Sequence, residues 1–176
     1  TFAMTEVLPV SGRVCEQGHL HHDLNMGLVE LIALDGARPA APGELGTVVI
    51  TPYYPYRECM PVLRYDTRDL VRRLPDTPLD CSLAGIPGCS RILGKAGQEV
   101  RVGERVITPR ALVEACEALP GEPWPARFAA RAPGGRLELT LSADTAGPLS
   151  PAELSERLGA DCTVVAAPVR HLRADL

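Results

Sequence analysis

The sequence is poor in several features that mark out common classes of protein. Lysine occurs once, as Lys95, and the aromatic residues Phe, Trp and Tyr make up only 4% of the 176 residues. The net charge is −4 with acidic and basic residues interspersed, and neither a basic stripe nor a set of stacking aromatics is visible, which argues against nucleic-acid binding. No apolar run approaches the ~20 residues of a membrane-spanning helix, so no membrane partner is expected.

Signals for export are also missing from the start of the chain. The first residues, Thr-Phe-Ala-Met-Thr-Glu, hold no basic segment followed by an apolar stretch, so we expect a cytoplasmic location. They also lack an initiator methionine, and we expect the chain to be an internal piece of a longer protein. Six cysteines at irregular spacing, without an export signal, are more typical of thiols or a metal site than of disulfides.

The first half of the chain has the pattern of a β-rich unit. Apolar and β-branched residues predict strands at 27–34 and 46–51, which an Asp-Gly pair and a Pro/Gly-rich loop join as a hairpin. Residues 52–61 hold three prolines and three tyrosines and are predicted to be irregular. Up to about residue 93 we therefore expect an antiparallel β subdomain.

Residues 64–69, Arg-Tyr-Asp-Thr-Arg-Asp, combine basic and acidic side chains within six positions. They are predicted to form a tight polar turn between strands at 61–65 and 69–74. A carboxylate fixed at such a turn can accept hydrogen bonds from a pair of sugar hydroxyls. The alternative interpretation is a solvated hairpin turn with a charged pair across it.

The pattern changes after Gly94, and the remainder predicts a small α+β unit. A helix is expected to begin with Thr108 as N-cap and Pro109 at its first position, and a second capped helix with Ser150 and Pro151. Strands are predicted at 99–102, 105–108, 126–131, 136–142 and 162–167. The predicted fold class of the whole chain is therefore α+β.

Several motifs occur in a fixed order around the polar turn. They are Phe-Ala-Met-Thr-Glu (2–6), Pro-Gly-Glu-Leu-Gly (42–46), the turn at 64–69, Arg-Ile-Leu-Gly-Lys-Ala-Gly (91–97) and Pro-Arg-Ala-Leu (109–112). In this order the chain resembles the adenylate-forming enzymes, the superfamily of acyl-CoA synthetases, adenylation domains and luciferases, and within it the phenylacetate-CoA ligase family. The resemblance implies the β-rich end of the large AMP-binding domain (1–93), a hinge (94–97) and the small mobile C-terminal domain (98–176).

The same resemblance implies a reaction and its cofactors. A small carboxylic acid, aromatic or similarly flat, would react with ATP to give an acyl-adenylate, and the acyl group would pass to a thiol. The acceptor would be CoA, a carrier protein or an amine. ATP/AMP and Mg²⁺ would be cofactors, and the remainder of the large domain would be a partner.

Individual residues receive roles through this resemblance. Thr5 would contact an AMP phosphate and Glu6 a Mg²⁺ ion, which makes them the expected catalytic residues. The residues implied in nucleotide binding are Phe2, which would stack on adenine, Ala3, Asp69, which would grip the ribose hydroxyls, Arg91 and Lys95. Ala3 and Met4 would line the acyl pocket, and Gly97 would serve as the hinge.

The chain departs from the family pattern at several of these positions. Lys95 replaces an Arg and Gly97 an Asp, and residues 102–104 replace a basic-Gly pair on the loop that would face CoA. No lysine occurs in residues 168–176, where the resemblance implies the catalytic one, so this chain alone is not expected to adenylate a substrate. The competing hypothesis is a non-catalytic, zinc-stabilised scaffold or interaction domain derived from such an enzyme.

A group of cysteines and histidines predicts a structural zinc site. Cys15 and His21 lie in one loop, and Cys81 and Cys89 lie in another; together they offer the ligand types of a tetrahedral Zn²⁺ site. The resembled family often has a second Cys two residues after the Cys81 position, but Leu83 stands there, so Cys89 or, second to it, Cys59 would serve. The alternatives are scattered free cysteines, a catalytic pair of bases, or a solvated loop in which His19 and His22 are exposed. The two remaining cysteines, Cys116 and Cys162, are expected in the core.

Overall fold

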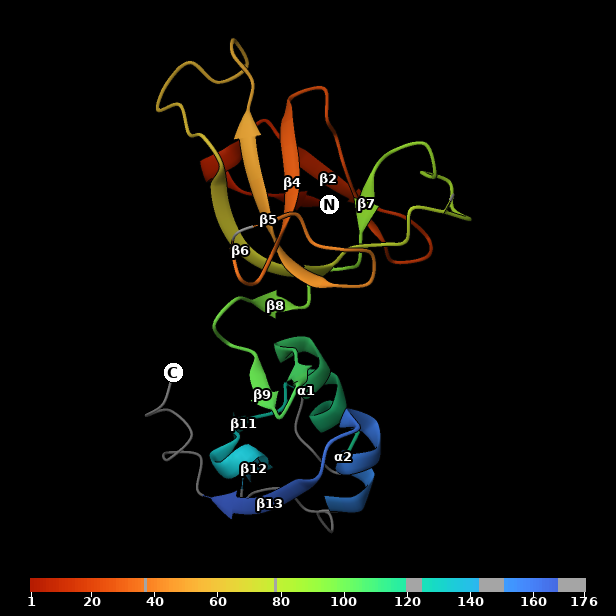
Figure 1. The fold of residues 1–176 in the computed structure, drawn as a ribbon, viewed down its shortest axis with the longest axis vertical. Coiled ribbons are helices and arrows are strands. Elements are labelled where there is room, and N and C mark those ends of the chain that lie inside the picture. The colour runs from red at the N-terminus through yellow and green to blue at the C-terminus, as the bar shows by residue number, and fades with distance from the viewer. Residues whose placement is uncertain (37, 78, 120–124, 143–150, 168–176) are drawn as a thin grey trace. The chain divides into compact units, whose positions relative to one another are not determined.

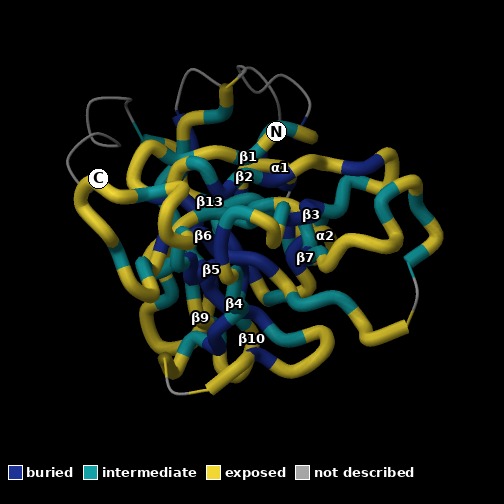
Figure 2. The backbone as a smooth tube through the Cα atoms, turned by 90° about the horizontal axis from the view of Figure 1, so that it is seen from above, coloured by how far each residue is buried: buried dark blue, intermediate teal, exposed yellow. Residues whose placement is uncertain are grey.

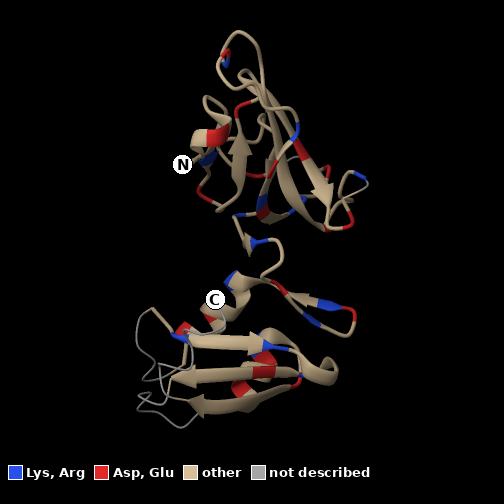
Figure 3. Ribbon diagram, turned by 90° about the vertical axis from the view of Figure 1, so that its left-hand side faces the viewer, with Lys and Arg blue, Asp and Glu red and all other residues tan. Residues whose placement is uncertain are grey.

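The computed structural model describes residues 1–36, 38–77, 79–119, 125–142 and 151–167. It divides into two compact units, Thr1–Ala96 and Gly97–Leu176. The described part of the first unit consists of strands and one 3₁₀ turn, and that of the second combines strands with two α-helices, so the predicted α+β class of the whole chain is confirmed. Acidic and basic side chains are interspersed over both units (Figure 3). Among the described residues, no helix is both long and apolar enough to cross a membrane.

The first unit is built from two four-stranded antiparallel sheets (Figure 1). One sheet has the order β1-β2-β3-β7. Its strands are β1 Phe2–Ala3, β2 Ser11–Val14, β3 Leu20–His22 and β7 Gly88–Cys89. The other has the order β4-β5-β6-β8. Its strands are β4 Gly27–Ala33, β5 Leu45–Pro52, β6 Tyr65–Arg72 and β8 Gly94–Lys95.

A single apolar core joins these two sheets. Leu20 and Cys89 enter it from one sheet, and Val48, Ile50 and Val71 enter it from the other. The first six residues of strand β5 are buried (dark blue in Figure 2), as expected for a strand covered on both faces. The predicted β4–β5 hairpin is confirmed, and the stretch predicted as irregular at 52–61 contains no helix or strand beyond Pro52, the last residue of β5. The strand predicted at 61–65 is wrong for residues 61–64, where Arg64 adopts a left-handed φ of 50° that interrupts extended backbone.

The turn predicted at residues 64–69 is wrong, because Tyr65–Arg72 forms one strand, β6. Its pairing with β5 shifts register between Thr47 and Val49, which marks a β-bulge. At the bulge the Thr67 hydroxyl donates to the Val48 carbonyl at 2.8 Å, and Arg68 adopts a left-handed φ of 59°. A bulge needs unusual backbone conformations, as a turn does. The polar residues that allow such conformations therefore led to the prediction of a turn.

The second unit contains a hairpin, two helices and a three-stranded sheet. Its elements are β9 Val100–Val102, β10 Arg105–Ile107, α1 Pro109–Glu117, β11 Phe128–Arg131, the 3₁₀ turn Pro133–Gly135, β12 Leu137–Ser142, α2 Pro151–Leu158 and β13 Cys162–Ala167. Strand β12 pairs antiparallel with β11 and parallel with β13. The predicted strands and helices of this unit are confirmed to within a few residues.

Capping and alternation explain this second unit. The Thr108 side chain accepts a hydrogen bond from the Ala111 N–H at 3.3 Å, which confirms the predicted N-cap. The cap predicted at Ser150 lies outside the described residues. Alternate residues of β12 are buried and pack with α1 and α2 in one core, which contains Cys116 and Cys162 as predicted.

Candidate functional site

Two loops of the first unit bring two thiols and two imidazoles together. Cys15 and His19 stand at the ends of a tight turn after β2, in which the Cys15 N–H donates to the His19 carbonyl at 3.0 Å. His21 lies in β3, and Cys81 lies in the connection between β6 and β7. One ligand atom from each of these four residues lies within 4.8 Å of all the others. We call these four residues the Cys/His cluster.

Hydrogen bonding orients the imidazole of His21 for ligation. Its Nδ1 lies 2.7 Å from the Ile86 carbonyl oxygen, so Nδ1 carries the hydrogen and donates it. Its Nε2 then faces the Cys81 Sγ at 3.5 Å. Bond lengths of ~2.0–2.3 Å to Zn²⁺ in a tetrahedral site require ligand atoms roughly 3.5 Å apart. The outer hydrogen bond to Ile86 is of the kind that fixes the tautomer of a metal-binding histidine.

A buried nitrogen of His19 without a hydrogen-bond partner is also available to bind a metal ion. The His19 Nδ1 is buried and has no hydrogen-bond partner, which is unfavourable unless the atom binds something. The Glu16 carboxylate holds the two loops together by accepting from the Ser82 N–H at 2.7 Å and the Ser82 hydroxyl at 2.6 Å. Two Cys and two His donors are a typical set for structural Zn²⁺, so the residues of the cluster fit this ion.

The two thiols of the cluster differ in acidity. Burial works to raise the pKa of Cys15, but hydrogen bonding within the cluster and with the backbone of the turn outweighs burial and lowers the pKa. Burial raises the pKa of Cys81, and the neighbouring Cys15 adds to this effect. Cys15 therefore ionises first, and a bound cation would favour the thiolate form of both.

Cys89 lies outside the Cys/His cluster, and His19 stands with Cys15, His21 and Cys81 instead. Cys89 belongs to β7 and is fully buried in the core, with its Sγ 3.6 Å from the Nε2 of His22. Burial raises the pKa of Cys89 to about 12, while burial, with a smaller effect of the neighbouring His21, lowers the pKa of His22 to about 4. Both side chains are therefore neutral at pH 7.

The histidine run is not a solvated loop, because only 1% of His21 and 3% of His22 is exposed. Cys59 is exposed and is not part of the cluster. His19 follows Cys15 by four positions, with Gly18 in the turn between them. This short spacing is the sequence signal that could have identified His19 as a candidate ligand.

The second group of predicted site residues surrounds the β6 bulge. Asp69 is only 6% exposed, yet its carboxylate forms an ion pair with Lys95, with Nζ and Oδ1 at 2.9 Å. The same Nζ donates to the Thr67 carbonyl at 3.1 Å. Lys95 reaches Asp69 because β8 pairs with β6 at this position. The carboxylate is therefore held in one orientation beside the bulge.

Arg68 fastens the end of the first unit to β6. The Ala96 N–H donates to the Arg68 carbonyl at 2.7 Å, and the Arg68 Nη2 donates to the Ala96 carbonyl at 2.8 Å. Gly97, the predicted hinge, follows directly and has a φ of 91°, which favours glycine. The division between the two units falls between Ala96 and Gly97.

The N-terminal segment carries the remaining predicted residues. Thr5 and Glu6 begin the 3₁₀ turn η1 Thr5–Val7, and both side chains are exposed, as is Ala3. Phe2 and Met4 are half-buried against the core, and the Phe2 ring meets the His22 ring edge-on with centroids 5.8 Å apart.

The segments that carry Thr5 and Asp69 both lie against β5, since η1 contacts this strand and β6 pairs with it. Arg91 is exposed in the segment between β7 and β8.

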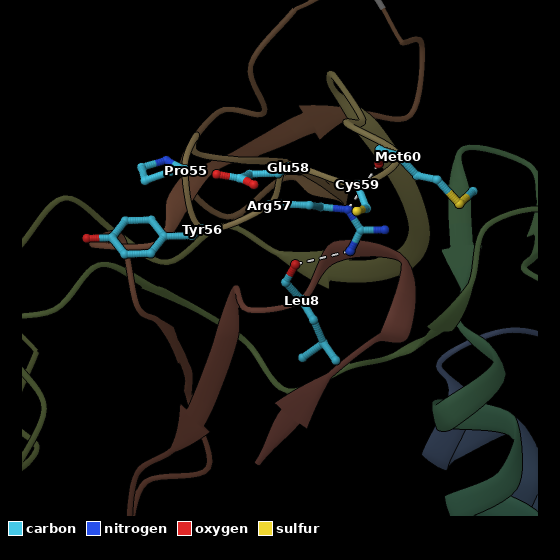
Figure 4. Close-up of a pocket in the computed structure, with 7 residues that line it drawn as sticks. All are labelled: Leu8, Pro55, Tyr56, Arg57, Glu58, Cys59 and Met60. Carbon is cyan, nitrogen blue, oxygen red and sulfur yellow. Dashed lines mark hydrogen bonds between the residues drawn. The ribbon is translucent and has the colours of Figure 1, made fainter.

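A shallow pocket of about 530 Å³ lies next to η1 (Figure 4). Leu8 lines it from one side, and Pro55 to Met60 line it from the irregular loop that precedes β6. Arg57 is the only base among these lining residues, and sequence reasoning did not single it out. No local sequence pattern predicts its role, because the Thr5 and Leu8 carbonyls to which it donates lie 52 and 49 positions earlier in the chain.

The solved structures that this chain resembles include acyl-CoA ligases and synthetases. A crystal structure of 2-hydroxyisobutyryl-CoA ligase in the postadenylation state with R3-HIB-AMP matches with a TM-score of 0.68 at 18% identity, over 95% of this chain and 38% of that one. An open conformation of that enzyme with 2-HIB-AMP and CoA matches with a TM-score of 0.65 at 18% identity, over 99% of this chain and 41% of that one.

A third similar structure is o-succinylbenzoate CoA synthetase from Bacillus subtilis in complex with the acyl-adenylate intermediate OSB-AMP. It matches with a TM-score of 0.57 at 15% identity, over 86% of this chain and 32% of that one. At these identities the likeness establishes a shared fold, and this chain spans well under half the length of each structure. No protein-family model and no curated protein matches the sequence.

Proposed function

We propose that this chain is part of an ATP-dependent acid–thiol ligase related to the phenylacetate-CoA ligases. A carboxylate oxygen of the acid would attack the α-phosphorus of ATP and pyrophosphate would leave, giving an acyl-adenylate. A thiol of CoA or of a carrier protein would then attack the acyl carbon and AMP would leave. The shared fold and the ordered motifs support this reaction class, and an aromatic or similarly flat acid is proposed from the resemblance.

The buried, ion-paired carboxylate of Asp69 is the observation that carries this proposal. A carboxylate accepts hydrogen bonds only, so it suits the two donating hydroxyls of a ribose. Lys95 holds one oxygen at 2.9 Å and orients the carboxylate before any ligand arrives. Pre-orientation of this kind lowers the entropy lost on binding.

Thr5 and Glu6 are proposed to act on the phosphate side of the same nucleotide. The exposed Thr5 hydroxyl can donate to a phosphate oxygen, and the exposed Glu6 carboxylate is a suitable ligand for Mg²⁺. A bound Mg²⁺ would neutralise charge on the phosphates and the departing pyrophosphate. Phe2, with its ring fixed by the edge contact to His22, is proposed to cover the adenine, and Ala3 and Met4 to border the acyl group.

The units are proposed to pivot at Gly97 between the two half-reactions. Arg68 secures the chain up to Ala96, and Gly97 is the first residue beyond these bonds with a backbone suited to large φ/ψ changes. Arg91 and Lys95 would keep the nucleotide side of the hinge positively charged.

Carboxylate-dependent exchange of labelled pyrophosphate into ATP tests this proposal in the full-length protein. A panel of aromatic and short aliphatic acids supplies the substrate, and Asp69→Asn is compared with Asp76→Asn, a surface carboxylate paired with Arg73. The proposal predicts exchange with at least one acid, its loss in Asp69→Asn and its retention in Asp76→Asn. No exchange with any acid, or equal exchange in both variants, would refute it.

A second candidate function is a zinc-stabilised, non-catalytic scaffold. The Cys/His cluster favours it, because two thiols and two imidazoles are a typical ligand set for structural Zn²⁺. Stoichiometric zinc together with no nucleotide binding would support this candidate over the ligase. Zinc with nucleotide binding would support the ligase.

A further inference from the structure

We infer that Arg57 is a positioning residue that fixes the positions of Thr5 and Glu6 and thereby the affinity of the protein for the nucleotide phosphate. The inference rests on the proposed function, since it needs Thr5 and Glu6 to face a phosphate and its metal ion. Arg57 acts through the backbone of η1 and is not proposed to touch the ligand.

One guanidinium group joins two segments that are far apart in the sequence. The Arg57 Nη1 donates to the Thr5 carbonyl at 3.2 Å and to the Leu8 carbonyl at 3.1 Å. Its Nε donates to the Met60 carbonyl at 3.1 Å, within its own loop (Figure 4, which shows the bonds to Leu8 and Met60). Arg57 thus clamps the turn that carries Thr5 and Glu6 to the loop that precedes β6.

The turn has a backbone hydrogen bond of its own, from the Val7 N–H to the Met4 carbonyl at 3.1 Å, and Arg57 adds the bonds to the Thr5 and Leu8 carbonyls. It is one 3₁₀ turn of three residues, and its N-cap residue Met4 makes no side-chain capping bond. Val7 anchors it from below, since this side chain is completely buried in the core. Thr5 and Glu6 point to solvent, so their positions follow from the backbone alone. The hydrogen bonds of Arg57 are what fix that backbone on the side of the loop.

The geometry requires arginine specifically. A guanidinium presents donors in a fixed plane, so Nη1 and Nε can serve two segments at once, whereas a lysine ammonium is a single point of attachment on a flexible stem. The loop contains no helix or strand over residues 53–64, and the three bonds of Arg57 add to the backbone bonds that hold its start, from the Tyr53 N–H to the Met26 carbonyl at 2.9 Å and from the Arg57 N–H to the Tyr53 carbonyl at 3.2 Å. One side chain therefore links the loop to the turn.

This role predicts a selective effect on ligands that carry phosphate. Adenosine would be held through its ribose by Asp69, and AMP would add the contact with Thr5. A hydrogen bond between a neutral donor and a charged phosphate contributes roughly 10-fold or more to affinity. Arg57→Ala should therefore weaken AMP about 10-fold while leaving adenosine within about 2-fold. A general loss of folding would weaken both ligands equally.

Calorimetric titration of adenosine and of AMP into the full-length protein tests the inference. The variants are Asp69→Ala, Thr5→Ala, Arg57→Ala, Arg57→Lys and the control Arg72→Ala, which removes another guanidinium–carbonyl bond, to Gly43 at 2.6 Å. Arg57→Ala and Arg57→Lys should behave like Thr5→Ala, with selective loss of AMP, and Arg72→Ala like the wild type.

The outcomes separate this inference from the proposal on which it rests. If the wild type binds neither ligand, or if Asp69→Ala binds both normally, the proposed function fails and takes the inference with it. If Asp69→Ala and Thr5→Ala behave as expected but Arg57→Ala binds AMP like the wild type, only the inference is overturned. Equal weakening of adenosine and AMP by Arg57→Ala also overturns it, because that result indicates a general structural role.

Discussion

Gly88 offers a direct way to disturb the Cys/His cluster without removing a ligand. A Cβ atom at this position would lie 3.0 Å from the His21 Nδ1 and 3.1 Å from both the His21 Cε1 and the Leu20 carbonyl oxygen. Ordinary contacts of a Cβ begin at 3.4 Å, so the His21 ring must shift by several tenths of an ångström. The 2.7 Å hydrogen bond from Nδ1 to the Ile86 carbonyl would be strained by that shift.

The expected loss of zinc affinity follows from the place of the His21–Ile86 hydrogen bond, which supports a ligand and does not touch the metal itself. Loss of such a bond to a metal-binding histidine typically lowers metal affinity about 10–100-fold. That range corresponds to ~1.4–2.7 kcal/mol of binding free energy. With zinc in excess, the free energy of unfolding of the variant falls by the same amount. For a unit of this size we expect the zinc-dependent part of the melting temperature to fall by on the order of 10 °C in Gly88→Ala.

Competition with a chromophoric chelator measures the affinity, and melting with and without EDTA isolates the zinc-dependent stability. Gly85→Ala is the matched control, because its added Cβ would meet no atom within 4 Å. It should bind zinc like the wild type. If Gly88→Ala holds zinc as tightly as Gly85→Ala, or if EDTA leaves the melting temperature of the wild type unchanged, the reasoning about the cluster is refuted.

Three further measurements test other parts of the structure. The pKa of Glu44 is lowered from 4.5 to about 2 by hydrogen bonds from Arg38 and the Ala41 N–H, so its contribution to stability is present above pH 4.5 and is lost as the pH falls through 2. Arg38→Ala should raise this pKa toward 4.5 in an NMR titration, and an unchanged value would contradict the assignment. Thr108→Ala should destabilise the second unit by ~1 kcal/mol in urea unfolding, with Thr108→Ser close to wild type; equal losses would argue against the cap. Leu139→Ala should cost about 2–5 kcal/mol in the same assay while metal content stays constant, and a loss of zinc would show that the two units are not independent.

Periodicity and capping were sufficient to predict most of the fold. The alternation of Leu137, Leu139 and Leu141 and the Thr-Pro pair at residues 108–109 predict β12 and α1 correctly, because each depends on residues close in sequence. The polar segment at residues 64–69 misled the prediction. Its strand is set by pairing with β5 and by the Thr67–Val48 bond, which no local pattern records.

The residue types of the candidate zinc site were predictable, but the choice among the available side chains was not. Cys15, His21 and Cys81 were predicted from residue type and resemblance and do lie together, but whether His19 or Cys89 joins them depends on which side chain the core buries. Arg57 was missed because its role arises from contacts across roughly fifty residues, between a loop and a turn that share no motif.

A crystal structure of the full-length protein with AMP tests the central claim most directly. The account predicts that both ribose hydroxyls lie within hydrogen-bond distance of the Asp69 carboxylate, about 2.6–3.2 Å, and that a phosphate oxygen meets the Thr5 hydroxyl. A nucleotide bound elsewhere, with Asp69 still paired only with Lys95, would contradict it.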